Sequence, residues 1–490
     1  MMLRALATIG ALQVVTMLVL LARTKTLAVV LGPELVGVMA VIDKLLAVIA
    51  GTVSLSLPYA AVRFLPERWT AGPSAFRALF ARMRNVLLVL IAGATAIAIV
   101  VTLFWPAAWG EALRPYREVV IVAILGLPVI ALVPFLQNAI AGRLEQNRSM
   151  LVGLLNAVAL AAAAVGIWLA GLAGYYAAYA VLGVFLVVGI TRMTTRGTES
   201  GAAPGLEHRR FPLDLPAPIW RFGGALLILT FLVPYAALFV HYQLLSDHGA
   251  EAAGWMQAAM GIGLAVRGVL GGAHSVFLTP NVNRGGSPAD RMEWANQFQL
   301  TFCLLAGLAA TPLLLFPDLA IYLLYSSEFA PGAAFAMLFV LTEVLTLLSG
   351  TYQGLVVALD HMRVHVVNNL IAQLLVVAAA YQLVGPLGIL GAGLAGLAAP
   401  VFMFVATMIF LRRSFGLRMP RGVAARSGWL LLGLAGAGLV GALMPEFTWQ
   451  ALVLKLFAYL LVCAGFAALL TAHERKRARE ILAGWRARWA

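Results

Sequence analysis

Arg267 stands in the middle of an apolar stretch, where a charged side chain is costly and usually faces a cavity or a partner. Gly263, Gly271 and His274 share its face at helical spacing, so two positions without side chains flank the guanidinium. Such a face lies against either a tightly packed helix or a water-filled cleft. We expect Arg267 to line a cleft, and a purely structural ion pair is the alternative.

Three further cations lie within or beside apolar stretches of the chain. Lys44 shares its face with Gly37 and Gly51. Arg23 and Lys25 lie towards the end of the first stretch, where they could instead extend to lipid headgroups. Point charges and an arginine fork suit a phosphate or a diphosphate, so a cleft lined by these cations predicts an anionic ligand.

Few acidic residues are placed to balance these cations. Asp43 adjoins a lysine in sequence, but neighbouring positions on a helix do not face each other. Glu343 heads a stripe of polar and small residues at helical spacing, which continues through Thr346, Gly350 and Gln353. Both acids are candidates for a coupling role, in which they bind a proton or a cation, or for a role as counter-ions of the basic side chains.

The aromatic residues are less informative than the charged ones. Most tyrosines and tryptophans lie near the ends of apolar stretches, as in the belts that mark membrane interfaces. We assign the tyrosines at 175, 176 and 179 to such a belt. The candidates for stacking against a sugar are Tyr59, Tyr242 and Tyr352.

Motifs for catalysis or cofactor binding are absent or out of context. No glycine is followed by lysine, which excludes a phosphate-binding P-loop. The segment Gly391–Gly396 matches a dinucleotide fingerprint formally, but it lies in an apolar stretch with no strand before it. His361 and His365 are spaced for a metal, yet they border a short turn. We therefore expect no catalytic residues, no metal and no cofactor, and thus no enzyme.

Composition and charge distribution define the protein class. The 490 residues are 62% hydrophobic and 11% charged, which excludes a soluble domain. Fourteen apolar stretches each approach the ~20 residues that cross a membrane. Of the 34 Lys and Arg residues, 27 fall in one set of alternate gaps and 4 in the other, which predicts that both termini are cytoplasmic. The net charge of +14 indicates anionic lipid headgroups rather than nucleic acid as partners.

The loops divide the chain into parts. We expect an N-terminal six-helix lobe at 1–191, a cytoplasmic linker at 192–218 and a second six-helix lobe at 219–411. A basic loop and two additional transmembrane helices follow at 412–472, and a cytoplasmic basic amphipathic tail at 473–490. Six is an even number of crossings, so both lobes have the same orientation, as in transporters built from parallel repeats.

Three segments carry a resemblance to a known family. RTKTLAVVLGPELVG at 23–37 resembles the opening motif of the polysaccharide biosynthesis flippases, which belong to the multidrug/oligosaccharidyl-lipid/polysaccharide exporter superfamily. AAVRFLPER at 60–68 is similar to the cytoplasmic exit of their second helix. LLYSSEFAPGAAFAMLFVL at 323–341 is similar to the segment that enters their tenth helix, although Ser326 replaces the usual glycine.

The resemblance implies two six-helix bundles around a central cleft in a bacterial inner membrane. It implies a polyprenyl-diphosphate-linked oligosaccharide as cargo, turned from the cytoplasmic to the outer leaflet by alternating access for O-antigen or exopolysaccharide synthesis. Other polysaccharide-assembly proteins are implied as partners. Related flippases use basic residues on helices 1, 2 and 8, and Arg23, Lys25, Lys44 and Arg267 match these helices by position.

Two other functions stay open. A cation-coupled drug or metabolite exporter of the same fold would require buried acids in the first lobe, where only Asp43 qualifies. A polyprenyl-sugar polymerase or ligase is the alternative from another class. It is disfavoured because the predicted outer loops are too short for a catalytic domain.

Overall fold

The computed structural model describes residues 2–143, 145–196, 213–273, 286–444, 448–470 and 474. Within these ranges the regular structure is helical, without a β-strand. The predicted all-α polytopic membrane fold is confirmed. His274, most of the predicted linker and the predicted tail apart from Glu474 lie outside the described residues.

The described residues contain enough long apolar helices for the predicted number of crossings. Ten segments are long and apolar enough to cross a membrane, and a bent pair of helices passes the same test. Three of the ten contain a sharp break and can therefore cross twice, which brings the candidate crossings to fourteen. The breaks lie at Gly32 in α1 (Met2–Val53), Gly171 in α7 (Ile167–Thr195) and Gly249 in α8 (Ala217–Ala273).

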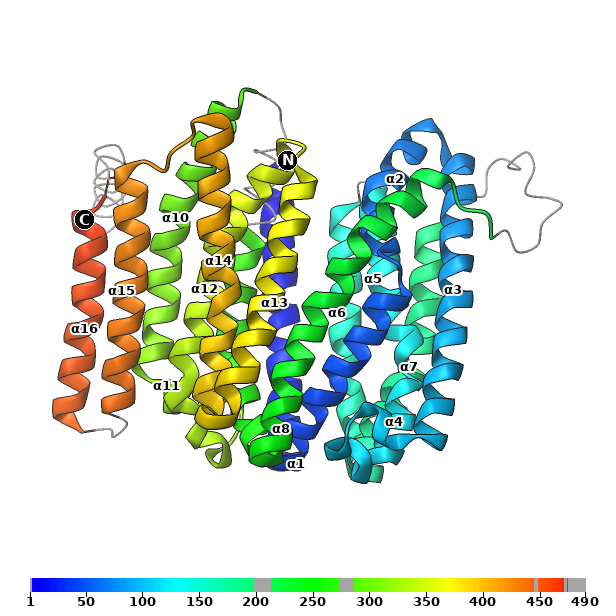
Figure 1. Ribbon diagram of the computed structural model, residues 1–490, viewed down its shortest axis with the longest axis horizontal. Helices are drawn as coiled ribbons and strands as arrows, with labels where there is room; N and C mark the ends of the chain where they lie inside the picture. The colour runs from blue at the N-terminus through cyan, green and yellow to red at the C-terminus, as the bar shows by residue number, and fades with distance from the viewer. Residues whose placement is uncertain are drawn as a thin grey trace. The chain divides into compact units, whose positions relative to one another are not determined.

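These breaks replace predicted outer loops by turns of one or two residues, a single glycine in α1 and α8 and the pair Ala170 and Gly171 in α7. Gly32 has φ +68° and Gly249 has φ +87°, values in the left-handed region that glycine tolerates best. Pro33 follows Gly32 and begins the second half of α1, a position that proline favours because its nitrogen has no hydrogen to donate. Figure 1 shows α1 running away from the N terminus and turning back at this point.

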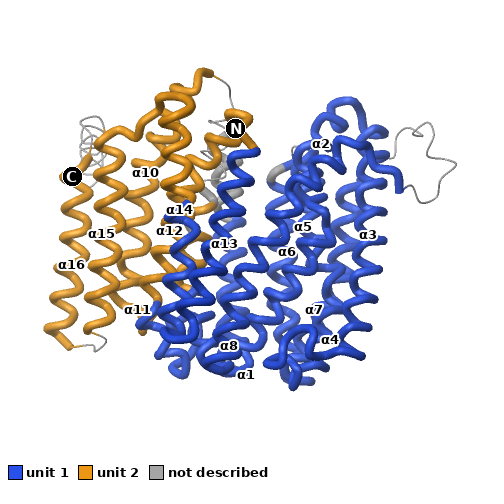
Figure 2. Tube along the Cα trace, in the orientation of Figure 1, with its two compact units in different colours: residues 1–261, 321–335, 363–402 blue, residues 262–320, 336–362, 403–490 orange. Residues whose placement is uncertain are grey.

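The chain forms two compact units, coloured in Figure 2. Unit 1 comprises residues 1–261, 321–335 and 363–402, and unit 2 comprises 262–320, 336–362 and 403–490. The division into two six-helix lobes stays a prediction.

Unit 1 contains α1, α7, most of α8, and α2 (Leu57–Ala71), α3 (Pro73–Phe104), α4 (Arg117–Ile124), α5 (Leu127–Gly142), α6 (Gln146–Ala163), most of α13 (Met362–Leu387) and part of α14 (Ile389–Phe415). Its 3-10 segments are η1 (Pro106–Trp109), η2 (Glu111–Tyr116), η3 (Ala164–Gly166) and η5 (Ser327–Phe335). Unit 2 contains α10 (Pro288–Leu315), α12 (Ala336–Ala358), α15 (Arg421–Leu443) and α16 (Trp449–Ala468). The boundary between the two units falls inside α11 (Pro317–Leu324), whose first half belongs to unit 2 and whose second half belongs to unit 1.

Small residues bring α1 and α8 into backbone contact inside unit 1. A Cβ atom on Gly37 would lie 2.0 Å from the carbonyl oxygen of Ala250, and one on Gly51 would lie 2.2 Å from that of Thr230. Such close approach is typical of glycines at helix interfaces in membranes. Because these two glycines flank Lys44 on its own face, that lysine lies on the side of α1 that packs along α8.

In unit 2, Arg426 joins three helices. The side chain is 1% exposed and donates to the backbone carbonyl oxygens of Leu300 in α10, at 3.1 Å, and of Leu469 at the end of α16, at 2.6 Å. Its two Nη atoms also reach the two carboxylate oxygens of Glu474, at 2.9 and 2.8 Å. The buried guanidinium thus connects α10, α15, the end of α16 and Glu474.

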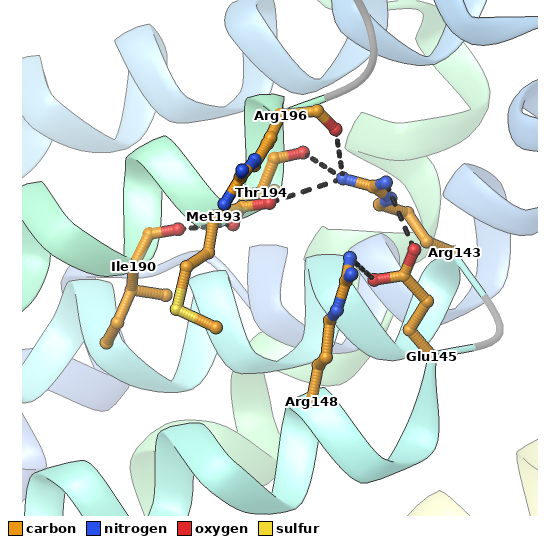
Figure 3. A network of polar contacts seen from close by, with 7 residues as sticks. All are labelled: Arg143, Glu145, Arg148, Ile190, Met193, Thr194 and Arg196. Atoms are coloured by element: carbon orange, nitrogen blue, oxygen red, sulfur yellow. Dashed lines mark hydrogen bonds and ion pairs between the residues drawn. The ribbon is translucent and has the colours of Figure 1, made fainter.

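Arg143 has a similar structural role in unit 1 (Figure 3). Its Nη1 atom donates to the carbonyl oxygens of Thr194 and Arg196, at 2.7 and 3.1 Å, where α7 ends. Its Nη2 atom pairs with Glu145 at 3.1 Å, and the guanidinium lies 4.5 Å from the ring centroid of Trp69. A cation at this place satisfies free carbonyls and the negative end of the helix dipole.

Candidate functional site

A buried polar cluster in unit 1 holds Arg23. The Nε atom of Arg23 donates to the hydroxyl of Tyr175 at 3.0 Å, and Nη2 donates to the same oxygen. The guanidinium lies 5.2 Å from the centroid of that ring, which is only 1% exposed. Arg23 therefore points into the protein and does not extend to lipid headgroups.

Asp43 belongs to the same cluster. It accepts a hydrogen bond from the hydroxyl of Tyr176 at 2.8 Å, and Tyr176 is 3% exposed. The carboxylate is close enough to Arg23 and to Lys44 to interact with both electrostatically. Adjacent tyrosines on α7 thus hold an arginine and an aspartate that lie on the two halves of α1. We call Arg23, Asp43, Tyr175 and Tyr176 the unit 1 cluster.

The assignment of these tyrosines to an interface belt is wrong. Tyr175, Tyr176 and Tyr179 are at most 6% exposed, and all three hydroxyls are hydrogen bonded. A signal was present in the sequence, because Tyr175, Tyr179 and Gly183 share one helical face. The glycine on that face packs against Val129 of α5. An aromatic face that ends in a glycine is more typical of tight packing than of a belt.

Lys44 faces α8 and differs from Arg23 and Lys25, which are both hydrogen bonded. It interacts electrostatically with Asp43 and with His241 of α8, a 2% exposed residue that the sequence did not single out. Both ring nitrogens of His241 are hydrogen bonded, Nδ1 to the carbonyl oxygen of Ala237 at 2.8 Å and Nε2 to Oε1 of Gln257 at 3.4 Å. Among the described residues, Lys44 makes no hydrogen bond and no ion pair, so its ammonium can accept a ligand.

Lys25 lies outside the unit 1 cluster. Its ammonium donates to the backbone carbonyl of Tyr322 in α11 and lies 5.0 Å from the centroid of that aromatic ring. A carbonyl and an aromatic face satisfy an ammonium without neutralising it.

Arg267 and Glu343 form an ion pair within unit 2. The Nη1 atom of Arg267 lies 3.2 Å from Oε2 of Glu343, and the two side chains are 52% and 14% exposed. A Cβ atom on Gly263 would lie 2.8 Å from the carbonyl oxygen of Phe339 and 3.2 Å from Cγ of Glu343. Gly263 thus lets α8 approach α12 closely one turn before Arg267, whereas a Cβ atom on Gly271 would meet nothing within 4 Å. The ion pair was the alternative to the expected cleft, and the cleft itself stays a prediction.

The three tyrosines considered for sugar stacking lie in different settings. Tyr59 is 58% exposed on α2. Tyr242 packs its ring against Gly110, beside η1 and η2. Tyr352 is fully buried and donates to Asn296 at 3.0 Å, so its ring is not free to contact a sugar. Only the first two remain candidates.

The described residues offer no group of three or more histidine, cysteine or acidic side chains that could hold a metal ion. His361 packs edge-on against Phe410 and Phe415, and His365 faces Asn369. Lys455, in α16, is 2% exposed and lies 4.8 Å from the ring centroid of Phe316. Of the four cations predicted to bind the ligand, Lys44 makes no hydrogen bond or ion pair within the described ranges, and Arg267 is half exposed.

Solved structures of membrane transporters resemble this chain over most of its length. An inward-facing multidrug resistance MATE family transporter of the MOP superfamily matches with a TM-score of 0.61 and 15% identity, over 86% of this chain and 95% of that one. The lipid II flippase MurJ, in an inward closed conformation, matches with a TM-score of 0.65 and 11% identity, over 94% and 97%.

A MOP superfamily transporter from Pyrococcus furiosus Vc1 (DSM3638), described as having a binding pocket of reversed polarity, matches with a TM-score of 0.56 and 14% identity, over 88% and 96%. No family model and no curated protein matches the sequence. The chain is thus a polytopic membrane protein with the fold of MOP superfamily transporters. Membership of the polysaccharide flippases within that superfamily stays a prediction.

Proposed function

We propose that this protein is a flippase, which moves a polyprenyl-diphosphate-linked oligosaccharide from the cytoplasmic to the outer leaflet. The observation that carries the proposal is that cationic side chains lie within apolar spans and are open to a ligand. Lys44 has no hydrogen-bonding or ion-pairing partner among the described residues, and Arg267 is 52% exposed although it is ion-paired. Charges in such positions are rare unless they serve a substrate.

The chemistry of these groups suits a diphosphate. Phosphate oxygens accept from an arginine fork and are attracted by ammonium groups. The groups that contact Arg23 and Lys25 are a tyrosine hydroxyl, aromatic rings and a carbonyl, none of which carries a negative charge. The fold shared with the lipid II flippase MurJ supports a lipid-linked cargo. Alternating access of the cationic groups to the two membrane faces would carry that cargo across.

The proposal is tested in cells that lack the protein. Lipid-linked oligosaccharide units should be made but remain on the cytoplasmic leaflet, and surface polysaccharide should be lost. Wild-type protein should restore labelling of these units by a membrane-impermeant reagent, whereas Arg267→Ala and Lys44→Ala should not. Arg114→Ala is the matched control, since Arg114 is an exposed arginine paired only with Glu111 among the described residues. Normal outer-leaflet labelling in the deletion strain would refute the flippase.

A cation-coupled exporter is the second candidate, because Asp43 is a half-buried carboxylate in the first half of the chain and the MATE transporter shares the fold. Deletion would then leave polysaccharide unchanged and raise sensitivity to cationic compounds. A polymerase or ligase would show a third pattern. Single lipid-linked units would still reach the outer leaflet, where the impermeant reagent labels them.

A further inference from the structure

We propose that Glu343 is an internal competitor for Arg267, which holds the guanidinium while the transporter is empty and is displaced by the phosphate of the cargo. This inference rests on the proposed flippase function. It gives the carboxylate a role in selectivity and release, in place of a permanent structural ion pair. The argument depends on how the pair is made, on which partner can move and on the charge of the incoming group.

The ion pair is made by one contact only. One guanidinium nitrogen, Nη1, meets one carboxylate oxygen, Oε2, at 3.2 Å. Arginine has five N–H donors, and the structure shows no second acceptor for Arg267 among the described residues. With half of its side chain exposed, Arg267 is held weakly, as is usual for single-contact pairs open to water. The contact is strong enough to position the arginine and weak enough to exchange.

The movable partner is the arginine. Glu343 is 14% exposed, and its Cγ atom packs so near Gly263 that a Cβ atom there would lie 3.2 Å away. The backbone of α8 therefore limits the motion of the glutamate stem. Arg267 has a longer side chain with more rotatable bonds and is 52% exposed. A ligand would draw the guanidinium away from a carboxylate that stays in place.

The charges determine the direction of the effect. A phosphate and the Glu343 carboxylate are both anionic, so they repel each other when they share one guanidinium. When cargo binds, the half-buried carboxylate loses its cation. The free-energy cost of leaving that charge unpaired opposes binding and favours release. The cost of parting the ion pair is the same for every ligand that displaces the carboxylate, whereas the repulsion between that carboxylate and the ligand grows with the negative charge of the ligand. Glu343 should therefore weaken the binding of a diphosphate more than that of a monophosphate.

The test measures binding of farnesyl diphosphate, a short polyprenyl diphosphate, to purified full-length protein in detergent by titration calorimetry. Glu343→Gln keeps the shape and removes the charge, so it should tighten binding by about threefold to tenfold. Arg267→Gln should weaken binding at least tenfold. The double variant should behave like Arg267→Gln alone, because the carboxylate acts only through that arginine.

A second readout is the preference for farnesyl diphosphate over farnesyl monophosphate, which Glu343→Gln should increase, because the removed charge repels the more anionic ligand more strongly. Glu293→Gln is the matched control, since Glu293 is exposed on α10 and should change neither quantity. If Glu343 has only a structural role, Glu343→Gln should weaken the binding of farnesyl diphosphate. Unchanged or weaker binding by this variant would therefore overturn the inference. Binding by the wild type would still support the flippase proposal. Absence of binding by the wild type refutes the diphosphate cargo, and this inference with it.

Discussion

At the scale of single residues, the unit 1 cluster gives each of its two charged groups a tyrosine of α7 as hydrogen-bond partner. Tyr175 accepts from Arg23, and Tyr176 donates to Asp43, and the two charged groups also attract each other electrostatically. The hydroxyl of Tyr176 orients the carboxylate, so that the aspartate has a neutral partner as well as its two cationic neighbours. Neutral partners of this kind keep a cationic group available to a ligand.

Removal of one hydroxyl should therefore reduce anion binding. Tyr176→Phe leaves Asp43 without its donor, and the carboxylate should then turn towards Arg23 and Lys44 and neutralise them. A hydrogen bond to a charged group contributes roughly 1.5–3 kcal/mol, so binding of farnesyl diphosphate should fall about tenfold or more. Calorimetric titration of the purified variant measures this loss.

Tyr179→Phe is the control for that substitution. Its hydroxyl contacts Asn156 at 3.3 Å and has no charged partner, so the same loss of one oxygen should leave anion binding near the wild-type value. Equal losses in both variants would mean that the tyrosines act through packing alone, and the proposed role of the unit 1 cluster would be wrong.

At the scale of elements, arginines fasten helix ends that lie far apart in the sequence. Arg143 caps the end of α7, Arg291 donates to the carbonyl of Ala358 at the end of α12, and Arg426 donates to that of Leu469 beyond α16. Each arginine belongs to a gap predicted to be cytoplasmic, and so does each capped end. If the predicted orientation holds, helix dipoles and basic loops stabilise one another on the cytoplasmic side.

Arg143→Gln should destabilise unit 1. The substitution removes the ion pair with Glu145 and the cation over Trp69, and it leaves carbonyls at the end of α7 without their donor. Loss of a buried, multiply bonded charge typically costs about 3–5 kcal/mol, so a clear fall in the thermal unfolding midpoint in detergent is expected. Arg148→Gln removes only an exposed partner of the same glutamate and should shift the midpoint little.

Some elements could be predicted from the sequence and others could not. Charge and hydropathy were sufficient for the helical spans, and Glu343 was recognised as a possible counter-ion, which its ion pair with Arg267 matches. The cleft predicted for Lys44 and Arg267 stays a prediction. His241 and Tyr176 were not recognised as neighbours of Lys44 and Asp43, because they come from helices whose positions only the packing determines.

At the scale of the whole molecule, the orientation in the membrane is the property still to be measured. From the charge asymmetry, reporters fused near Gly110, Gly249 and Ser327 should be outside, and those near Thr70 and Pro420 should be inside. Cysteine labelling with an impermeant reagent at the same positions gives an independent reading. A consistently inverted pattern, or an odd number of crossings, would contradict the predicted topology.

The arginine caps also bear on biogenesis. During synthesis, basic loops resist translocation and so determine which way each pair of helices inserts. On the predicted orientation, Arg143, Arg291 and Arg426 give this signal first and are later engaged by the carbonyls of helices made after them. Once α7, α12 and α16 are complete, these three arginines are engaged by backbone carbonyls, and Arg143 and Arg426 are at most 6% exposed. On that orientation, assembly engages part of the signal that directed insertion and so opposes a later reversal of the topology.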